Sequence, residues 1–579
     1  MENIKESETN SENQLEYIGF MNSVKQVKRN IDKLSYLILL GGMILGMEIS
    51  SLTLFLNESY FVEYFGSLTS FRQGLLTAAS PLGGIFGCMM YGIIMKSKGR
   101  IWSFRFGTTL WIIGSIIAAS VWNIWIIVIA RFLKGITVGM FSILLTAYIN
   151  EIFPMERKGK SIAILHFGTT VSIFLTYLLC SVFNFLKNHY SFRIVWMIES
   201  IPAIFLLIGT LWMPESPRWL TLHGEYEKAI MVQNRLIKEY NWKKIRNFFE
   251  LTDKLDIITL YGKESESYGY NELFKQGCWK QMLLCILLQI LLNFSGMSIL
   301  LYYIPYVCEM IGLENDFKIL AGLAPYFVNM LLGLLPLTYI ENIGRKDLIL
   351  VGSIPCSIFM ILIGTIMGVC GYSIDTLEGS TGVNNNNNSI NWKVDFQTGS
   401  IIFALCLIFI SFFTLTLANG PNIYIGEILP LNARPKGFIL NIFIGWVLNF
   451  SITLLCPLLF CKLKWGVFLL FGIISLMISI ILFKCLIETK GLEIGEINKL
   501  FEPRTGRIEK DVQDSSETKE FNFISSLKSN SGQDGTGKLD EEKSNFKFLD
   551  DEKEIELITP ITFSIADDEI DLGQVEQGI

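Results

Sequence analysis

Long apolar runs alternate with short polar segments along the chain from residue 34 onwards. The apolar runs are roughly 18–25 residues long, which is the length that an α-helix needs to cross ~30 Å of hydrocarbon at ~1.5 Å per residue. Twelve such runs predict twelve transmembrane helices, at about 34–56, 71–95, 103–121, 125–148, 161–183, 194–213, 280–304, 318–340, 347–370, 399–425, 437–461 and 465–486. The pattern therefore predicts an all-α polytopic membrane protein.

The polar segments divide these helices into two groups of six. The first 33 residues contain no apolar run, so we expect no cleavable signal peptide. The segment between the two groups is rich in Glu, Lys and Asn, and its pattern predicts short amphipathic helices. The expected organisation is a cytosolic N-terminal tail (1–33), a six-helix bundle (34–213), a cytosolic linker with short helices (214–279), a second six-helix bundle (280–486) and an acidic, mostly disordered cytosolic tail (487–579).

The charge is unevenly distributed along the chain. The formal net charge is −6, but residues 488–579 alone hold 23 acidic and 11 basic side chains, which leaves the rest of the chain at +6. Most Lys and Arg residues of the short loops fall on the side that also holds the N-terminus, and cytoplasmic loops collect these residues. We therefore expect both termini in the cytoplasm, and the plasma membrane is the expected location.

The composition argues against several classes of protein. Hydrophobic residues make up 51% of the chain and charged residues only 18%, whereas soluble domains hold about 25% charged residues. The three His and eleven Cys residues show no metal-ligand spacing, so neither a metal nor another cofactor is expected. The chain has no glycine-rich nucleotide loop, which argues against ATP-driven transport. We expect neither enzymatic activity nor a nucleic-acid partner.

An internal repeat relates the two groups of helices. Residues 148–154 read YINEIFP and recur as residues 424–430, which read YIGEILP, each at the end of the fourth helix of its half. Each half also has a basic turn between its second and third helices, at Gly99-Arg100 and at Gly344-Arg345. Two six-helix halves with matching motifs are typical of transporters whose substrate path lies between the repeats at mid-membrane.

Further motifs stand beside these repeats. Residues 214–220 read PESPRWL directly after the sixth predicted helix, and residues 488–491 read ETKG after the twelfth. Over about residues 34–500, this set of motifs resembles that of the sugar porters of the major facilitator superfamily. The resemblance implies two pseudo-symmetric six-helix bundles, the major facilitator fold, that rock about a central cavity. It also implies a carrier of a monosaccharide or a similar polyol.

Charged residues collect at the predicted cytoplasmic ends of the helices. A Glu at a helix end beside an Arg-bearing loop can form a charge-assisted pair across the interface between the two bundles. We expect such pairs to close the cytoplasmic side while the cavity opens outward; the alternative is that they only anchor helix ends in the headgroup region. The expected gate residues, including those of the motifs, are Arg100, Glu151, Glu215, Arg218, Glu341, Arg345, Glu427 and Arg434.

Ionisable residues within the predicted helices form a second group of candidates. A charge inside the membrane costs roughly 2.5–3.5 kcal/mol, so each one indicates a functional role. Glu48 and Arg131 lie at matching depths in the first and fourth helices, so they can pair. The resemblance implies that protonation of Glu48 releases Arg131, and that Glu199 in the sixth helix takes part in the same proton coupling. The alternatives are a static ion pair and, for Glu199, a packing role.

Polar side chains within the apolar helices indicate a substrate site, because each buried donor or acceptor must find a partner. The candidates from the residues themselves are Gln289, Asn293, Ser298, Tyr302, Tyr303, Asn329, Trp446 and Asn449. The resemblance adds His166 and Asn422, which stand where the family has glutamine and tryptophan. Leu292 and Ser298 stand where the family has amides that contact a hexose, so the identity of the solute stays open.

The expected function is transmembrane transport of a monosaccharide or a similar polyol, coupled to protons as a symport. The expected partners are the sugar or polyol, the proton, the lipid bilayer and a cytosolic partner of the acidic tail. Three alternatives stay open. They are a facilitative carrier, a carrier of another small organic solute such as an inositol or an organic ion, and a nutrient sensor that signals through its tail without transport.

Overall fold

In a computed structural model of this chain, the structure describes residues 34–501 apart from 67–68, 154, 233–268, 275–277, 314, 374–391, 431–432, 493–496 and 498–499. The chain divides into two units, residues 1–502 and 503–579, and all described residues belong to the first. The expected N-terminal tail, the acidic tail from residue 502 onwards and the greater part of the expected linker lie outside the described residues.

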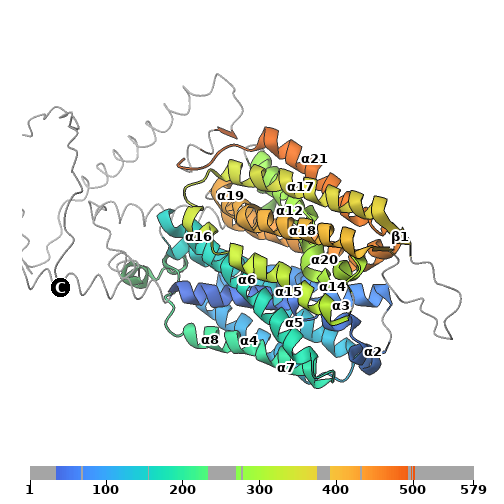
Figure 1. The fold of residues 1–579 in the computed structure, drawn as a ribbon. Helices are drawn as coiled ribbons and strands as arrows, with labels where there is room; N and C mark the ends of the chain where they lie inside the picture. The colour runs from blue at the N-terminus through green and yellow to red at the C-terminus, as the bar shows by residue number, and fades with distance from the viewer. Residues whose placement is uncertain are drawn as a thin grey trace, which may run out of the picture. The chain divides into compact units, whose positions relative to one another are not determined.

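The helices follow one another in the order of the apolar runs (Figure 1). The first half contains Leu34–Ser50, η1 (Phe55–Asn57), α2 (Ser59–Phe65), α3 (Ser70–Lys98), α4 (Arg100–Ala119), α5 (Ile124–Ile152), α6 (Met155–Asn184), α7 (Tyr190–Ile198), α8 (Ser200–Gly209) and α9 (Pro217–Leu222). The second half contains η2 (Tyr270–Phe274), α12 (Trp279–Phe294), α13 (Met297–Tyr302), α14 (Ile304–Met310), α15 (Asn315–Leu332), α16 (Pro336–Tyr339), α17 (Arg345–Cys370), α18 (Phe396–Phe412), the π-helical turn η3 (Phe413–Leu417), α19 (Gly420–Ile428), α20 (Arg434–Leu463) and α21 (Gly466–Cys485).

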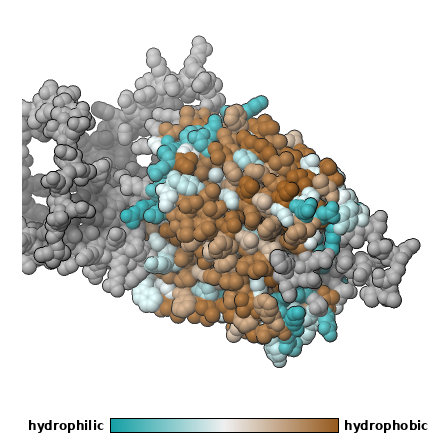
Figure 2. Space-filling view, viewed as in Figure 1, coloured by the Kyte–Doolittle hydropathy of each residue, from teal (hydrophilic) through white to brown (hydrophobic). Residues whose placement is uncertain are grey.

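Among the described residues, ten helical segments are long and apolar enough to cross a membrane. Two shorter apolar helices, Leu34–Ser50 and Trp279–Phe294, occupy the positions of the first and seventh predicted helices. Figure 2 shows hydrophobic residues across the middle of the bundle and hydrophilic residues toward its two ends, as a membrane-spanning bundle requires. The predicted all-α membrane fold is therefore confirmed. A short antiparallel pair, β1 (Gly371–Ser373) and β2 (Trp392–Val394), joins α17 to α18 and was not predicted.

Three of the transmembrane segments are interrupted at mid-length, each for an identifiable reason. The seventh breaks at Gly296, whose φ of +96° lies in the left-handed region that glycine adopts without strain. The sixth bends at Glu199, between α7 and α8, because Pro202 has no N–H to donate back into the preceding turn. The tenth passes through the π-helical turn η3 and restarts as α19 with Pro421 in its first turn.

The two halves meet along α3 and α20, and along α6 and α15. Within the first half, α3 lies directly against α5 because both helices carry glycine at the contact. A Cβ atom on Gly139 of α5 would lie 2.0 Å from the carbonyl oxygen of Gly84 in α3. This close approach brings the polar residues of α5 up to the seam between the halves.

Candidate functional site

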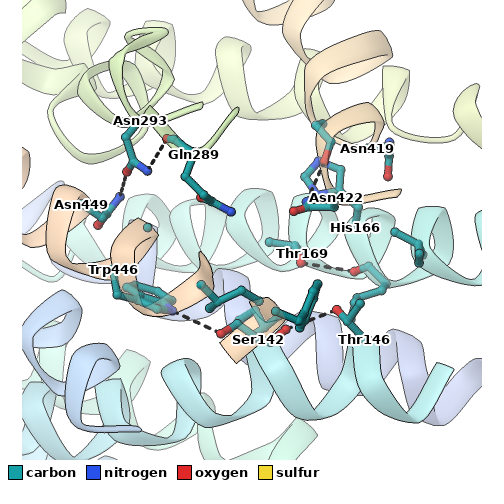
Figure 3. A pocket seen from close by; sticks show the side chains of 17 residues that line it. Ser142, Thr146, His166, Thr169, Gln289, Asn293, Asn419, Asn422, Trp446 and Asn449 are labelled. Atoms are coloured by element: carbon teal, nitrogen blue, oxygen red, sulfur yellow. Dashed lines mark hydrogen bonds between the residues drawn. The ribbon is translucent and has the colours of Figure 1, made fainter. Parts of the chain in front are cut away.

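A cavity of about 250 Å³ lies between the two halves. Side chains from α5 and α6 line it on one side, and side chains from α12, α19 and α20 line it on the other (Figure 3). The polar residues of the lining are Ser142, Thr146, His166, Thr169, Gln289, Asn293, Asn419, Asn422, Trp446 and Asn449. Among these described lining residues, His166 alone carries an ionisable side chain. The cavity therefore suits an uncharged polar ligand.

Six of the ten residues predicted to bind substrate line this cavity, namely His166, Gln289, Asn293, Asn422, Trp446 and Asn449. The other four do not line it. Ser298 lies just behind, with its Oγ atom 3.5 Å from Nδ2 of Asn449. The Tyr303 hydroxyl donates to the carbonyl of Thr453 at 2.7 Å, and Oδ1 of Asn329 accepts from Thr414 Oγ1 at 2.6 Å.

The fourth of these residues, Tyr302, is buried and faces the Glu48 and Arg131 side chains rather than the cavity.

The amide groups of the cavity form a partly connected network. Nδ2 of Asn293 donates to the carbonyl of Gln289 at 3.0 Å, and Nδ2 of Asn449 reaches Oδ1 of Asn293 at 3.5 Å (Figure 3). Oδ1 of Asn419 is buried, and no donor among the described residues hydrogen-bonds to it. A buried acceptor without a partner is costly, so this atom is available to a hydroxyl or amino group of a ligand.

Trp446 links the two halves at the cavity wall. Its indole Nε1–H donates to Oγ of Ser142 in α5 at 3.2 Å, and its ring lies on Gly84 of α3. A Cβ atom on Gly84 would lie 2.7 Å from the indole ring atoms, so only glycine leaves room for the ring there. The position of this aromatic face thus depends on both halves of the protein.

Four polar lining residues were missed in the sequence, namely Ser142, Thr146, Thr169 and Asn419. A Ser or Thr in an apolar helix is weak evidence for a binding site, because its hydroxyl can donate a hydrogen bond to a backbone carbonyl of its own helix. Thr146 does so, donating to the carbonyl of Ser142 at 3.2 Å. The sequence around Asn419 does indicate a special position. This residue stands just before a Gly-Pro pair inside an apolar run, and such a pair interrupts a helix.

The charged residues within the membrane are clustered in the first half. Nη1 of Arg131 lies 3.2 Å from Oε1 of Glu48, and Nη2 donates to the backbone carbonyl of Glu48 at 3.3 Å. The two residues therefore pair, as their depths in the sequence predicted. Both side chains are buried, and Arg131 also reaches Oγ of Ser51 at 3.5 Å, just after the first helix ends.

A lysine that was not among the predicted site residues lies between Glu48 and Glu199. Nζ of Lys134 lies 2.6 Å from Oε2 of Glu48 and 2.8 Å from Oε2 of Glu199. Lys134 follows Arg131 by one helical turn in α5, so both cations point the same way. An intramembrane lysine carries the same functional signal as an intramembrane acid, and this signal was present in the sequence.

At the predicted cytoplasmic end, each half contains the same arrangement of charges. In the first half, Arg100 pairs with Glu151, and the Glu215 carboxylate accepts from the backbone N–H groups of Arg100 and Ile101 at 2.9 and 3.1 Å. Glu215 thereby caps the first turn of α4, whose N–H groups have no partner within the helix.

In the second half, Arg345 pairs with Glu427 at 3.2 Å, and Glu488 accepts from the N–H groups of Arg345 and Lys346 at 2.8 and 3.0 Å. Glu488 therefore has the same role at α17 that Glu215 has at α4, although it was not among the predicted gate residues. Four backbone N–H groups, including those of Thr489 and Lys490, bond to its carboxylate. Partial burial raises the pKa of Glu488, but these four bonds outweigh it and hold the pKa below its usual value.

The other three predicted gate residues have different roles. The guanidinium of Arg434 donates to the carbonyl of Leu429 at 3.0 Å, beyond the last turn of α19, and makes no ion pair among the described residues. Glu341 accepts from the backbone N–H of Lys160 at 3.3 Å, which links the two halves. Burial lowers the pKa of Arg218, although the nearby Glu151 carboxylate opposes the shift.

The ion pairs of the gate were expected to cross the interface between the bundles, and the structure differs. Arg100–Glu151 lies wholly within the first half and Arg345–Glu427 wholly within the second. The repeated turns place each Arg beside the Glu of its own half, because each turn and its partner helix end belong to the same repeat. Besides the contact of Glu341 with Lys160, the halves are also joined at the opposite end, where the Tyr306 hydroxyl donates to Oε1 of Gln73 at 2.6 Å.

Comparison with known proteins matches the chain to transporters. The family model described as "Sugar (and other) transporter" matches residues 11–501. The chain is 34% identical over 474 residues to the probable metabolite transport protein YFL040W of Saccharomyces cerevisiae, covering 82% of this chain and 86% of that protein. It is 27% identical to the high-affinity glucose transporter 1 of Candida albicans, covering 80% and 84% of the two chains.

Among solved structures, the chain is similar to the major facilitator superfamily proton:xylose symporter XylE bound to 6-bromo-6-deoxy-D-glucose. The two share 21% identity and a TM-score of 0.66, over 82% of this chain and 99% of XylE. At this identity the likeness concerns the fold, and it agrees with the two-half helical architecture described above.

Proposed function

This chain belongs to the family of sugar (and other) transporters in the major facilitator superfamily, and we propose that it carries a neutral monosaccharide or a similar polyol by alternating access. The observation that carries the proposal is the cavity at the seam. Its polar side chains come from both halves, so a movement of one half against the other would open the cavity to one side or the other. The proposal is therefore of a carrier and not of an enzyme.

The lining suits a ligand with several hydroxyl groups. A side-chain amide offers both donors and an acceptor, and a hydroxyl does the same, so the two kinds of group can satisfy each other. Oδ1 of Asn419 would accept a hydrogen bond from one hydroxyl group, and Trp446 would present an aromatic face to the C–H surface of a ring. We propose that His166, Gln289, Asn293, Asn422 and Asn449 complete the site, with Ser298, Tyr302, Tyr303 and Asn329 supporting it from behind.

We propose that the end that holds Arg100 and Arg345 faces the cytoplasm and forms the inner gate. The Glu151 and Glu427 pairs, with Glu215 and Glu488 on the helix starts, would hold each half rigid there. The link from Glu341 to Lys160 would then be a contact that opens and closes. Arg218 and Arg434 would add positive charge around it.

Two modes of energy coupling each rest on a specific observation. Proton symport is supported by the buried Glu48–Arg131 pair, since a proton on Glu48 would release Arg131 and change the contacts of the first helix. Facilitative transport is supported by Lys134, which already neutralises the second charge of the acidic pair formed by Glu48 and Glu199. Both modes use the same cavity.

Uptake into proteoliposomes made with the full chain tests the carrier. We expect saturable uptake of at least one of D-glucose, D-xylose, L-arabinose and myo-inositol, and faster efflux of preloaded solute when the same solute is outside. Exchange of this kind is the signature of a single site with alternating access. If none of the four solutes moves, the carrier proposal fails, and a sensor without transport becomes the better explanation.

An imposed proton gradient then separates the two modes of coupling. A symporter accumulates solute above the outside concentration under an inward proton gradient, whereas a facilitator stops at equal concentrations. The matched control is the same gradient applied with a proton ionophore present. Alkalinisation of the outer medium on solute addition would be the independent sign of symport.

We also propose that the protein lies in the plasma membrane with both termini in the cytoplasm, and that the acidic tail binds a cytosolic partner. The orientation rests on the distribution of Lys and Arg among the short loops, and the proposed partner of the tail on the 23 acidic side chains of residues 488–579. Protease treatment of sealed right-side-out vesicles should leave both termini intact. Cleavage of either terminus in such vesicles would contradict the orientation.

A further inference from the structure

Lys134 is held at a site that is built for its ammonium group. Its side chain is 1% exposed, and its Nζ atom touches both Glu48 at 2.6 Å and Glu199 at 2.8 Å. The ammonium also lies 5.3 Å from the centre of the Trp111 ring, where the ring's electron-rich face attracts a cation. Lys134 therefore contacts three helices besides its own, namely the first helix, α4 and the bend between α7 and α8.

The neighbouring residues are shaped around this lysine. A Cβ atom on Gly114 of α4 would lie 2.7 Å from Cγ of Lys134, so the missing side chain makes room for the lysine stem. The indole N–H of Trp111 donates to the backbone carbonyl of Glu199 at 3.0 Å, which fixes the bend where Glu199 stands. These contacts position the ammonium between the two carboxylates.

The charges of the cluster balance without any proton. Glu48 and Glu199 supply two carboxylates, and Arg131 and Lys134 supply two cations. The other titratable groups that face the cluster are the Cys180 thiol from α6 and the Tyr302 phenol from α13. A buried cluster with equal numbers of opposite charges is far less costly than one with a net charge, because an uncompensated buried charge is strongly destabilising.

We infer that Lys134 takes the place of a coupling proton, so that this carrier reorients with its acidic pair neutralised by its own lysine. Without Lys134, two carboxylates would face one guanidinium, and a proton on Glu48 or Glu199 would be needed to restore balance. With Lys134 in place, a further proton would leave a buried positive charge. The inference rests on the proposed carrier function, and of its two modes it selects facilitative transport.

Lys134→Met tests the inference in proteoliposomes with a pH-sensitive dye, using the best-transported solute of the panel above. The wild-type chain should move solute with a proton-to-solute ratio near zero. The K134M variant should move about one proton per solute, and across a gradient of about one pH unit it should accumulate solute up to about tenfold. Lys134→Arg is the matched control, because it keeps the cation and should stay uncoupled.

The double variant K134M/E199Q provides a second, opposite test. It removes one cation and one carboxylate, so the cluster is balanced again and the proton movement of K134M should disappear. Thermal unfolding gives a readout that needs no transport. The deficit in Tm of K134M relative to the wild-type chain should shrink as the pH falls from about 8 to about 5, since a bound proton replaces the lost charge.

The outcomes separate failure of the inference from failure of the proposed function. Proton movement with solute by the wild-type chain overturns the inference, whatever the variants do. So does a K134M variant that transports without protons, or one whose Tm deficit is the same at both pH values. Absence of solute exchange by the wild-type chain instead refutes the carrier itself.

Discussion

Tyr306 of α14 donates its hydroxyl to Oε1 of Gln73 in α3 at 2.6 Å, and this bond joins the two halves at the end opposite the Arg100 and Arg345 turns. Oγ of Ser70 and Sγ of Cys461, which lie 3.3 Å apart, form a second link at the same end. Both links connect α3, in the first half, to a residue of the second half that is far away in sequence. Both of these links between the halves are hydrogen bonds between neutral groups.

Loss of the Gln73 contact should open that end. A typical hydrogen bond stabilises by about 0.5–1.5 kcal/mol, so Tyr306→Phe should raise the population of the state open at this end several-fold, up to about tenfold. Labelling of Cys461 by a membrane-impermeant maleimide, read by mass spectrometry of its peptide, measures this population. Tyr226→Phe, at an exposed position in the polar segment after α9, is the control. Equal labelling rates in Y306F and the wild-type chain would refute the role of the bond.

Removal of the Asn419 acceptor should weaken solute binding. A ligand hydroxyl that loses its buried partner costs about 1–3 kcal/mol, so Asn419→Ala should raise the KM for uptake by about tenfold or more. The exposed Asn188 offers the same substitution away from the cavity, and Asn188→Ala should leave the KM unchanged. An unchanged KM in N419A would remove Asn419 from the binding site.

Crowding of the Trp446 ring should disturb the cavity wall. Gly84→Ala places a methyl group 2.7 Å from the indole, which forces the ring away from Ser142, and overpacking of this kind costs about 1–3 kcal/mol. We expect a lower Tm and uptake reduced by about tenfold.

Gly92 lies further along the same helix, and a Cβ atom there would meet nothing within 4 Å. Gly92→Ala is therefore the control with the same change of backbone preference, and both its Tm and its uptake should match the wild-type chain. If G84A and G92A behave alike, the ring does not depend on Gly84.

The Glu488 cap should give stability that disappears in acid. Because its pKa in the folded protein lies below the usual value, the ionised carboxylate stabilises the fold above that usual value, and the gain is lost as the pH falls through the folded pKa. Glu488→Gln should lower Tm by on the order of 1–3 °C at about pH 7, the effect of losing a helix cap. The difference should shrink steadily as the pH is lowered below about 4.3, the usual carboxyl pKa. A difference that grows in acid would contradict this assignment.

The sequence predicted the helices well because the length and apolarity of a run decide whether it can cross a bilayer. It also predicted the Glu48–Arg131 pair, since depth along a helix follows from residue count. The direction in which a side chain points is harder to predict. A π-helical turn accommodates one extra residue and rotates everything after it by about 100°, so Asn419 and Asn422 reach the cavity in a way that periodicity alone did not indicate.

Side chains near the break at Gly296 illustrate the same difficulty. Asn293, before the break, lines the cavity, whereas Tyr302 and Tyr303, after it, turn toward the first half and toward Thr453. Lys134 was missed for a different reason. The depth along the helices already predicted Arg131 as the partner of Glu48, and no second cation was required. Only the packing of the helices in space shows that Lys134 pairs with Glu199.

The placement of the Arg100–Glu151 and Arg345–Glu427 ion pairs has a consequence for the kinetics of the proposed transport cycle. Because Arg100–Glu151 and Arg345–Glu427 each lie inside one half, neither pair has to break when the halves rotate as rigid bodies. The activation enthalpy of reorientation would then contain no term for separating these charges. Added salt would weaken the ion pairs within each half and so lower the stability of that half. Because these pairs stay intact during reorientation, the rate of turnover should be nearly independent of ionic strength.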